Sequence, residues 1–344
     1  MQRQSLIFTQ PHHVEIHEET LPPLASHQVL VQTLVSAISA GTEMLVYRGQ
    51  LPPDLTLDET INALSSTTQY PLKYGYAAVG RIIAVGHDID PSWQDQFVFA
   101  FNPHESHFIA DPAHLIPLPD SLPPETASLL PNMETAVSFV MDSQPMIGEQ
   151  VAVFGQGVVG LLTTHLLAQY PLASLVSLDA YPLRRALSQK WGATTSLDPT
   201  QPDALPQLMA ALQSERLHTT ADLTLELSGN PQALDMAIGV TGFGGRILIG
   251  SWYGQKQASL NLGGHFHRSH MHLISSQVSH INPQWQGRWN KERRLQTAVH
   301  HLHHLPTTEL ITHRIPFTQA PAIYRQLHQS PKAILQVILT YPTE

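Results

Sequence analysis

Val151-Ala-Val-Phe-Gly155-Gln-Gly157-Val-Val-Gly160 is the most informative segment of the 344-residue chain. Its apolar first residues predict a buried strand, and the apolar run Val158–Ala168 predicts a helix directly after it. Between them, Gly155 permits a tight turn, Gly157 lets backbone amides approach a pyrophosphate, and Gly160 lets the helix pack on the sheet. The segment predicts a dinucleotide-binding turn in which the phosphate faces the helix N-terminus. Glycines that only pack a strand, a turn and a helix are the alternative.

A second predicted strand, Ser174–Leu178, ends in the carboxylate of Asp179, about 20 residues after the glycine-rich turn. A carboxylate at this position accepts hydrogen bonds from the adenine ribose hydroxyls and repels a 2′-phosphate, so NAD(H) is favoured over NADP(H). Arg184 and Arg185 weaken this preference because either can approach a phosphate. We interpret both as lying on the outer face of the next helix, Leu183–Trp191, and NADP stays possible.

Strands and helices continue to alternate downstream, with a strand at Ala221–Leu227, a helix at Pro231–Ile238 and a strand at Arg246–Ile249. This alternation predicts a doubly wound α/β unit of parallel strands with crossover helices. Small residues follow the carboxyl ends of these strands, where the nicotinamide half of a cofactor would lie, although ordinary turns give the same pattern. The predicted cofactor-binding residues are Gly155, Gln156, Gly157, Val158, Val159, Gly160, Asp179, Arg184, Ser228, Gly229, Gly250 and Ser251.

The N-terminal third of the chain instead shows short strands separated by proline-rich joints, at Gln28–Val35, Gly80–Val85 and Gln96–Phe101. The polar stretch Leu51–Gln69 interrupts this region and is a candidate loop or lid. The C-terminal region returns to mixed strands and helices. We expect a β-rich catalytic domain formed by residues 1–120 and 266–344, and a dinucleotide-binding domain formed by residues 121–265.

The composition excludes several classes of chemistry. The chain has no cysteine, so disulfides, thiolate zinc sites, iron–sulfur clusters and cysteine nucleophiles are excluded. Its formal charge of −9 argues against nucleic acid as a partner. The apolar patch near Met1 is too short for a signal peptide, and Val151–Leu178, although uncharged, contains glycines and a proline that fit a buried strand, turn and helix better than a membrane span. A cytoplasmic protein with a small-molecule substrate is expected.

Three further motifs carry a family resemblance: Ser36-Ala-Ile-Ser39-Ala-Gly41-Thr42-Glu43, Tyr47-Arg48-Gly49 and Tyr70-Pro-Leu-Lys-Tyr-Gly75-Tyr76-Ala-Ala-Val79-Gly80-Arg-Ile. Together with the order of the domains, they make the chain resemble the medium-chain dehydrogenase/reductase superfamily over essentially its whole length. More narrowly, the motifs resemble the zinc-lacking branch that includes the bacteriochlorophyllide (hydroxyethyl) dehydrogenases. The resemblance implies a GroES-like β domain plus a Rossmann domain, with substrate and nicotinamide meeting in the cleft between them. It also implies a homodimer paired through an exposed sheet edge at Arg246–Ile249 or Met271–Val278.

The departures from the family pattern concern zinc. In zinc-dependent relatives a cysteine falls at Ser39, a His-Glu pair falls at Tyr76-Ala77, and a third ligand falls near Pro131-Asn132. None of these positions retains a good ligand. The structural-zinc lobe with its four cysteines is also missing, because the chain passes directly from Phe101 to Asn102. Both a catalytic and a structural zinc are therefore predicted to be absent.

Hydride transfer to a carbonyl leaves an oxyanion that must be stabilised and protonated, and hydroxyl or imidazole groups must do this without zinc. The resemblance places a hydroxyl near the substrate oxygen at Thr42, which is the first candidate donor. Ser39, Tyr76 and His104 are further candidates, and a histidine can exchange the proton with solvent near neutral pH. Alternatively, Thr42 only caps a turn and Tyr76 is a packed aromatic. Glu43 is expected to be structural, bonded to the backbone or to Arg48.

The leading functional hypothesis is a zinc-independent NAD(P)-dependent oxidoreductase that acts on an alcohol/carbonyl pair. Reduction of an activated carbon–carbon double bond, as in quinone and enone reductases, is a second hypothesis. A non-catalytic dinucleotide-binding sensor is a third. The histidine clusters at 265–272 and 300–304 are expected to be packed or solvated and not to bind a metal.

Overall fold

The structure is a computed structural model that describes residues 1–52, 60–64, 67–212 and 220–342. The chain forms two compact units, one of Met1–Pro131 with Val299–Glu344 and the other of Asn132–Ala298. Two helices, α3 (Leu130–Ser143) and α8 (Lys291–His303), run through the points where the chain passes from one unit to the other. Among the described residues, no helix combines the length and apolar character that a bilayer crossing requires.

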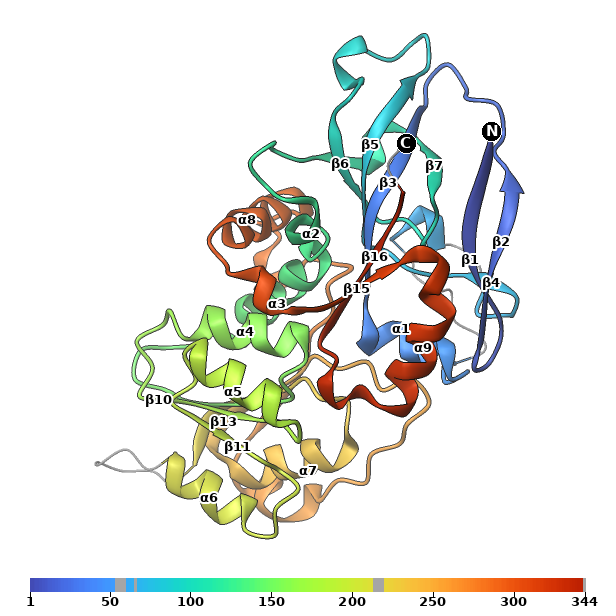
Figure 1. Ribbon diagram of the computed structural model, residues 1–344. Helices are drawn as coiled ribbons and strands as arrows, with labels where there is room; N and C mark the ends of the chain where they lie inside the picture. Colours follow the sequence, from blue (N-terminus) through green and yellow to red (C-terminus); the bar gives the residue numbers. More distant parts are fainter. Residues whose placement is uncertain (53–59, 65–66, 213–219, 343–344) are drawn as a thin grey trace. The chain divides into compact units, whose positions relative to one another are not determined.

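The second unit is built on a six-stranded parallel sheet with the order β11-β10-β9-β12-β13-β14. Its central strands are buried on both faces, which explains their continuous apolar sequences. Figure 1 shows α4 beside α5 and α6 beside α7, as expected when crossover helices cover both faces. The elements are β9 (Gln150–Phe154), α4 (Val158–Leu167), β10 (Ser174–Leu178), α5 (Pro182–Lys190), β11 (Thr195–Leu197), α6 (Ala204–Ala211), β12 (Ala221–Glu226), α7 (Pro231–Val240), β13 (Thr241–Ile249) and β14 (His272–Ser275).

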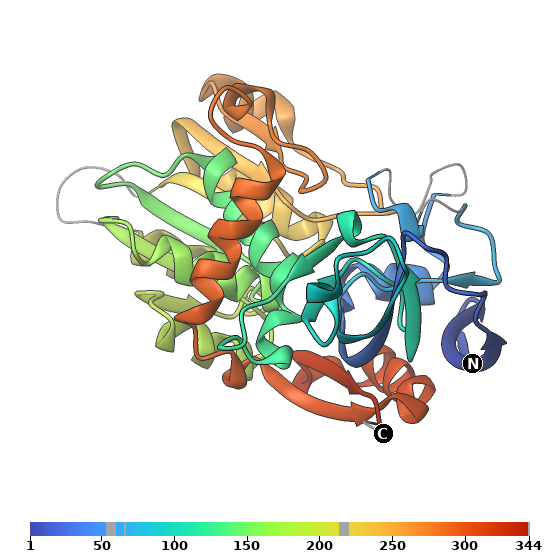
Figure 2. The same cartoon turned by 90° about the horizontal axis from the view of Figure 1, so that it is seen from above.

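The first unit contains a seven-stranded sheet with the path β15-β16-β3-β5-β6-β8, to which β7 is added by pairing with β3, and a three-stranded sheet β2-β1-β4. The C-terminal strand β16 pairs antiparallel with β3, so the end of the chain completes this unit (Figure 2). The strands are β1 (Gln2–Gln10), β2 (His13–Thr20), β3 (Val29–Ile38), β4 (Leu72–Lys73), β5 (Ala78–Val85), β6 (Phe97–Ala100), β7 (His107–Ala110), β8 (Leu115–Pro117), β15 (Ile311–Pro316) and β16 (Gln336–Thr340). The helices are α1 (Ala40–Tyr47), α2 (Pro124–Ala127) and α9 (Ala320–Gln329).

The boundaries of the units lie further along the chain than the expected positions 120 and 265. Helix α2 packs against β3 and β5 and so stays with the first unit. Strand β14 pairs with β13 and extends the parallel sheet. The segment after β14 is also held in the second unit, because Ser276 donates a hydrogen bond of 2.6 Å to Asp142 and Arg294 donates to the carbonyl of His280 at 3.3 Å.

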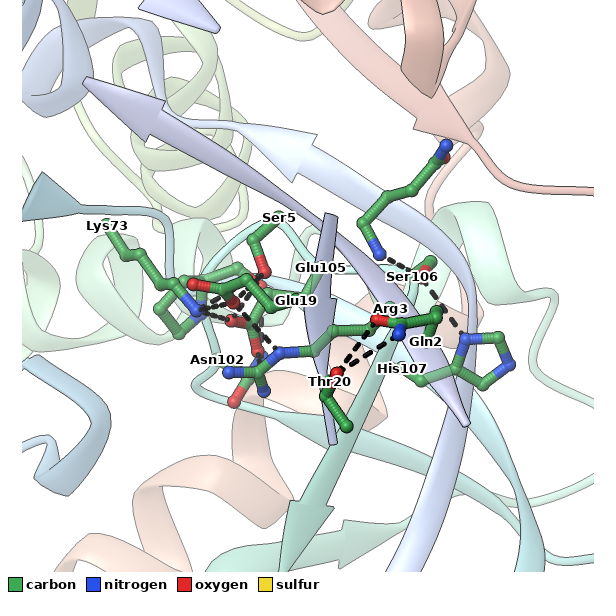
Figure 3. A network of polar contacts seen from close by, with 12 residues as sticks. Gln2, Arg3, Ser5, Glu19, Thr20, Lys73, Asn102, Glu105, Ser106 and His107 are labelled. Carbon is green, nitrogen blue, oxygen red and sulfur yellow. Dashed lines mark hydrogen bonds and ion pairs between the residues drawn. The ribbon is translucent and has the colours of Figure 1, made fainter. Parts of the chain in front are cut away.

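The segment after Phe101 is anchored by a polar network (Figure 3). Glu105 is nearly buried and accepts hydrogen bonds from Lys73 (2.7 Å), Ser5 (3.1 Å) and Arg3 (3.2 Å). Partial burial raises the pKa of Glu19, but hydrogen bonds from Lys73 and Ser5 outweigh it and lower this pKa to about 2. The network therefore ties the β1–β2 hairpin and β4 to the segment that begins at Asn102.

The candidate lid at Leu51–Gln69 falls largely outside the described residues, which omit 53–59 and 65–66. Leu51 and Leu64 are buried in the core that also contains α1 and α9. The described parts of this stretch are thus anchored to the first unit.

Candidate functional site

The glycine-rich turn connects β9 to α4, and its three glycines differ in their surroundings. Gly155 has a φ of +92°, and a Cβ there would lie 2.7 Å from the backbone nitrogen of Ser228. A Cβ at Gly160 would lie 2.0 Å from the carbonyl oxygen of Gly155. Close packing therefore excludes side chains at both positions. Gly157, by contrast, has a φ of −65° and open space around its Cβ position, so packing does not require glycine there.

Gly157 is the N-cap of α4 and supplies no side-chain cap to the first amides of that helix. Such amides and the helix dipole favour an anion. Val158 and Val159 are half-buried at the same helix end. The side chain of Gln156 is fully buried and accepts a hydrogen bond of 3.0 Å from Thr164. It therefore ties the turn to α4. The open end of α4 is therefore suited to a pyrophosphate.

Asp179 follows β10 and closes the other side of the turn. Its two carboxylate oxygens accept hydrogen bonds of 2.8 Å from the backbone N–H groups of Gln156 and Tyr181. A carboxylate can accept about four hydrogen bonds, so capacity remains for ribose hydroxyls. The role of Asp179 at the adenine ribose stays a prediction.

The interpretation that Arg184 and Arg185 lie on the outer face of α5 is wrong. Arg184 stacks on the ring of Tyr181 and brings its Nη1 to 3.7 Å from Asp179. Arg185 donates a hydrogen bond of 2.7 Å to the Asp179 carbonyl oxygen and pairs with Asp198 at 3.2 Å. Both arginines lie in the first turn of α5, next to the end of β10, and their side chains turn back to Asp179, Arg184 to its carboxylate and Arg185 to its main-chain carbonyl oxygen.

The predicted cofactor-binding residues that follow β12 and β13 lie close together in the structure. Gly229, with a φ of +65°, donates its backbone N–H to Ser251 Oγ at 2.8 Å. Ser228 donates its hydroxyl to Glu226 at 2.5 Å. A Cβ at Gly250 would lie 2.5 Å from the Phe139 ring, so glycine is needed there for packing. These residues follow β12 and β13 at the same edge of the sheet as the glycine-rich turn.

Three candidate catalytic hydroxyls meet in the first unit. The Tyr76 hydroxyl donates to Ser39 Oγ in a short hydrogen bond and lies 3.3 Å from Thr42 Oγ1. All three residues are half-buried, so Tyr76 is not simply a packed aromatic. Ser39 is the N-cap of α1, but its side chain makes no capping bond and faces Tyr76 instead. The cluster thus presents hydroxyl groups at the start of α1.

Glu43 lies beneath this cluster and holds it in place. Its Oε1 accepts the backbone N–H of Ser39, the N-cap residue of α1, at 2.7 Å. Its Oε2 accepts the hydroxyl of the buried Tyr324. Burial first, and then the Glu43 charge, raise the pKa of Tyr324 well above its usual range. The expected structural role of Glu43 is confirmed through its bond to the backbone, whereas Arg48 bonds to His328.

The structure does not support His104 as a group that touches the substrate. The side chain is fully buried, with Nε2 at 3.1 Å from Glu43 and Nδ1 at 2.7 Å from Ser36. Both ring nitrogens therefore have protein partners. Ser36 is in turn 2.8 Å from the hydroxyl of Tyr341. His104 belongs to the layer that supports Glu43.

The residues at this site do not fit a zinc ion. Zinc is held by thiolate, imidazole and carboxylate ligands, but the cluster offers the neutral hydroxyls of Ser39, Thr42 and Tyr76. The nearest carboxylate and imidazole, Glu43 and His104, are paired with each other. Within the described part of the chain, no group of three histidine or acidic side chains is placed to hold a metal ion.

His265, from the first histidine cluster, and the buried Glu134 both have structural partners. His265 contacts the carbonyl oxygen of Thr241 at 2.9 Å and Ser269 at 3.1 Å, which occupies both of its ring nitrogens. Glu134 accepts a hydrogen bond of 2.9 Å from the buried Arg294. Burial raises the pKa of Glu134, and the Arg294 charge opposes this shift. These groups tie elements of their own units together.

A sheet-rich GroES-like unit and a Rossmann unit with a glycine-rich turn are the architecture of the medium-chain dehydrogenase/reductase fold, so the predicted fold class is confirmed. No family model matches the chain. In sequence, the chain is similar to D-guloside 3-dehydrogenase of Escherichia coli K12, with 23% identity over 98% of this chain and 99% of that protein.

Two solved structures share the fold. The 2R,3R-butanediol dehydrogenase of Bacillus subtilis matches with a TM-score of 0.78 and 17% identity, over 99% of this chain and 100% of that one. An alcohol dehydrogenase of Escherichia coli CFT073, complexed with NADH, matches with a TM-score of 0.78 and 16% identity, over 98% and 99%. Together with the full-length sequence relative, they support the superfamily. The narrower resemblance to bacteriochlorophyllide dehydrogenases stays a prediction.

Proposed function

We propose that this chain is a zinc-independent oxidoreductase, preferring NAD(H), that transfers a hydride between nicotinamide and an alcohol/carbonyl substrate. The contact of Tyr76 with Ser39 and Thr42 carries the proposal, because it gathers proton donors where the resemblance expects metal ligands. The glycine-rich turn and Asp179 support a nicotinamide cofactor. The sequence relative is also a dehydrogenase, which supports an oxidoreductase.

The nicotinamide cofactor, when bound, supplies or accepts the hydride. In the direction of reduction, the substrate oxygen needs a proton as the carbon receives the hydride. Tyr76 can give its phenolic proton to that oxygen, because a phenol is far more acidic than an alcohol. Ser39 and Thr42 can then donate hydrogen bonds to the phenolate that remains. In the direction of oxidation, the same phenolate takes the proton from the alcohol.

The direct test measures NADH oxidation with a panel of aldehydes and ketones, on protein made without a histidine tag. We expect turnover that survives EDTA treatment and metal content far below one zinc per chain. Stoichiometric zinc whose removal abolishes turnover would overturn the zinc-independent mechanism. Products in which a carbon–carbon double bond has been reduced would favour an enone reductase. NADH binding with no turnover of any substrate would favour a sensor.

Cofactor preference is expected to depend on Asp179. The wild type should use NADH better than NADPH, because the carboxylate repels the 2′-phosphate. Asp179→Ser should shift the NADPH/NADH ratio of kcat/KM by about tenfold or more towards NADPH, since one lost charge repulsion of about 1.4 kcal/mol is a factor of ten. Arg184→Ala is the matched control. It should lower kcat/KM with NADPH and leave kcat/KM with NADH unchanged. A clear NADPH preference of the wild type would contradict the assignment.

We also propose a homodimer that pairs through β14. This strand ends the order of the parallel sheet, and its Leu273 is 39% exposed. Phe243 on the neighbouring β13 is 78% exposed, and apolar surface beside an open strand edge is suited to pairing between copies. Sedimentation velocity should show a dimer, and Leu273→Lys should shift it to monomer. A strict wild-type monomer would refute the proposal.

A further inference from the structure

Glu226 is the last residue of β12, and its side chain is fully buried. Its Oε1 accepts three hydrogen bonds: from the Ser228 backbone N–H at 2.8 Å, from the Ser228 hydroxyl at 2.5 Å and from the Gly229 N–H at 3.1 Å. Its Oε2 accepts the Tyr253 hydroxyl at 2.8 Å. One carboxylate therefore binds the loop after β12 and the loop after β13.

No lysine, arginine or histidine forms an ion pair with Glu226 within the described ranges. A buried carboxylate can stay ionised when several donors bind it, and four donors do so here. Tyr253 is a firm donor, because burial and the Glu226 charge raise the pKa of its phenol. Glu226 thus places a negative charge inside the second unit, at the carboxyl edge of the sheet.

The location of this charge gives it a role. Glu226 pairs in register with Phe154 and Ile249, so it lies level with the start of the glycine-rich turn. The Ser228 backbone packs directly against Gly155. Ser251 joins the two loops by accepting the Gly229 N–H at 2.8 Å. Lys256 reinforces the joint with a 2.8 Å bond to the Gly229 carbonyl oxygen.

Both loops follow strands whose carboxyl ends flank the nicotinamide half of a dinucleotide site. We infer that Glu226 is a positioning residue that fixes these loops and whose buried charge favours the oxidised, positively charged nicotinamide over the neutral reduced ring. This inference rests on the proposed nicotinamide cofactor. Charges in a poorly solvated interior are weakly screened, so one carboxylate can distinguish the two redox forms.

The test compares the Kd values of NAD⁺ and NADH by calorimetry on purified protein, without substrate. Glu226→Gln keeps the side-chain shape, because its oxygen can still accept from Ser228 and Gly229 and its amide can donate to the Tyr253 oxygen. It removes the charge and reverses the direction of the Tyr253 hydrogen bond. We expect the ratio Kd(NAD⁺)/Kd(NADH) to rise by about tenfold, equivalent to about one pKa unit of charge interaction.

Two control variants separate charge from shape. Tyr253→Phe removes one hydrogen bond but keeps the carboxylate. It should therefore lower the affinities for NAD⁺ and for NADH by the same factor. Glu226→Asp keeps the charge on a shorter side chain and should lower both affinities without changing their ratio; it also provides the comparison with wild type if the Gln variant is poorly folded. Thermal unfolding measured without cofactor checks that each variant is folded.

The outcomes are distinguishable. An unchanged NAD⁺/NADH ratio in folded Glu226→Gln, or a ratio that shifts equally in Glu226→Asp, would overturn the inference while leaving the proposed function intact. Wild-type protein that binds neither cofactor form would overturn the proposed function, and the inference with it.

Discussion

Tyr76→Phe is expected to lower the turnover of a carbonyl substrate by about 10²–10⁴-fold, the range attributed to a positioned general acid. The substitution removes one oxygen, and the half-buried ring can keep its place. The Kd of NADH should change little, because the glycine-rich turn belongs to the other compact unit. Single-turnover oxidation of bound NADH, followed at 340 nm, measures the chemical step without product release.

The neighbouring Tyr74 provides a matched control. Its ring centroid lies 6.0 Å from that of Tyr76, but its side chain is only 2% exposed. Tyr74→Phe should therefore keep turnover within a few-fold of wild type. Thr42→Val and Ser39→Ala should each reduce turnover by about tenfold, because each removes one hydrogen bond of about 1–1.5 kcal/mol from the phenolate. If Tyr76→Phe is as active as wild type and Thr42→Val is inactive, Thr42 is the proton donor instead.

The second unit was predictable from the sequence because its signals are local. The strand, the glycines and the helix of the dinucleotide turn are consecutive, and the same interactions that select glycine at positions 155 and 160 appear in the structure. The carboxylate of Asp179 follows from the end of a buried strand. The directions of Arg184 and Arg185 were not predictable, because they depend on how the first turn of α5 meets the end of β10.

The failure at His104 has a different cause. Its partners Ser36 and Glu43 lie 68 and 61 residues away along the chain, and only the pairing of distant strands brings them to the ring. The strand β2 was missed for a related reason. Most of its side chains are exposed, so the apolar alternation on which strand prediction relies is weak.

Glu226 shows a signal that was present but unused. It ends an apolar strand and precedes Ser228-Gly229, a position at which an acidic side chain can accept the N–H groups of the following turn. The sequence places it at the correct sheet edge. Its full burial and its bond to Tyr253, which comes from another loop, require the fold.

Gly157→Ala is expected to weaken NADH binding by about 10–100-fold while leaving the protein folded. No atom lies within 4 Å of the Cβ position, and the φ of −65° suits alanine, so the substitution meets no steric conflict in the free protein. A methyl group there would occupy the space through which the backbone approaches a pyrophosphate, which is why the binding motif needs glycine at this point. Fluorescence titration gives the Kd, and thermal unfolding should show a Tm within a few degrees of wild type.

Gly160→Ala is the opposing control. Its Cβ would lie 2.0 Å from the Gly155 carbonyl oxygen, so α4 must shift and stability should fall by about 1–3 kcal/mol, as for other overpacked sites. Cofactor affinity and Tm should therefore both fall in this variant. In Gly157→Ala, by contrast, the affinity should fall while the Tm stays close to that of the wild type. If Gly157→Ala binds NADH as the wild type does, the glycines serve only to pack a strand against a helix, because no other property of that position requires glycine.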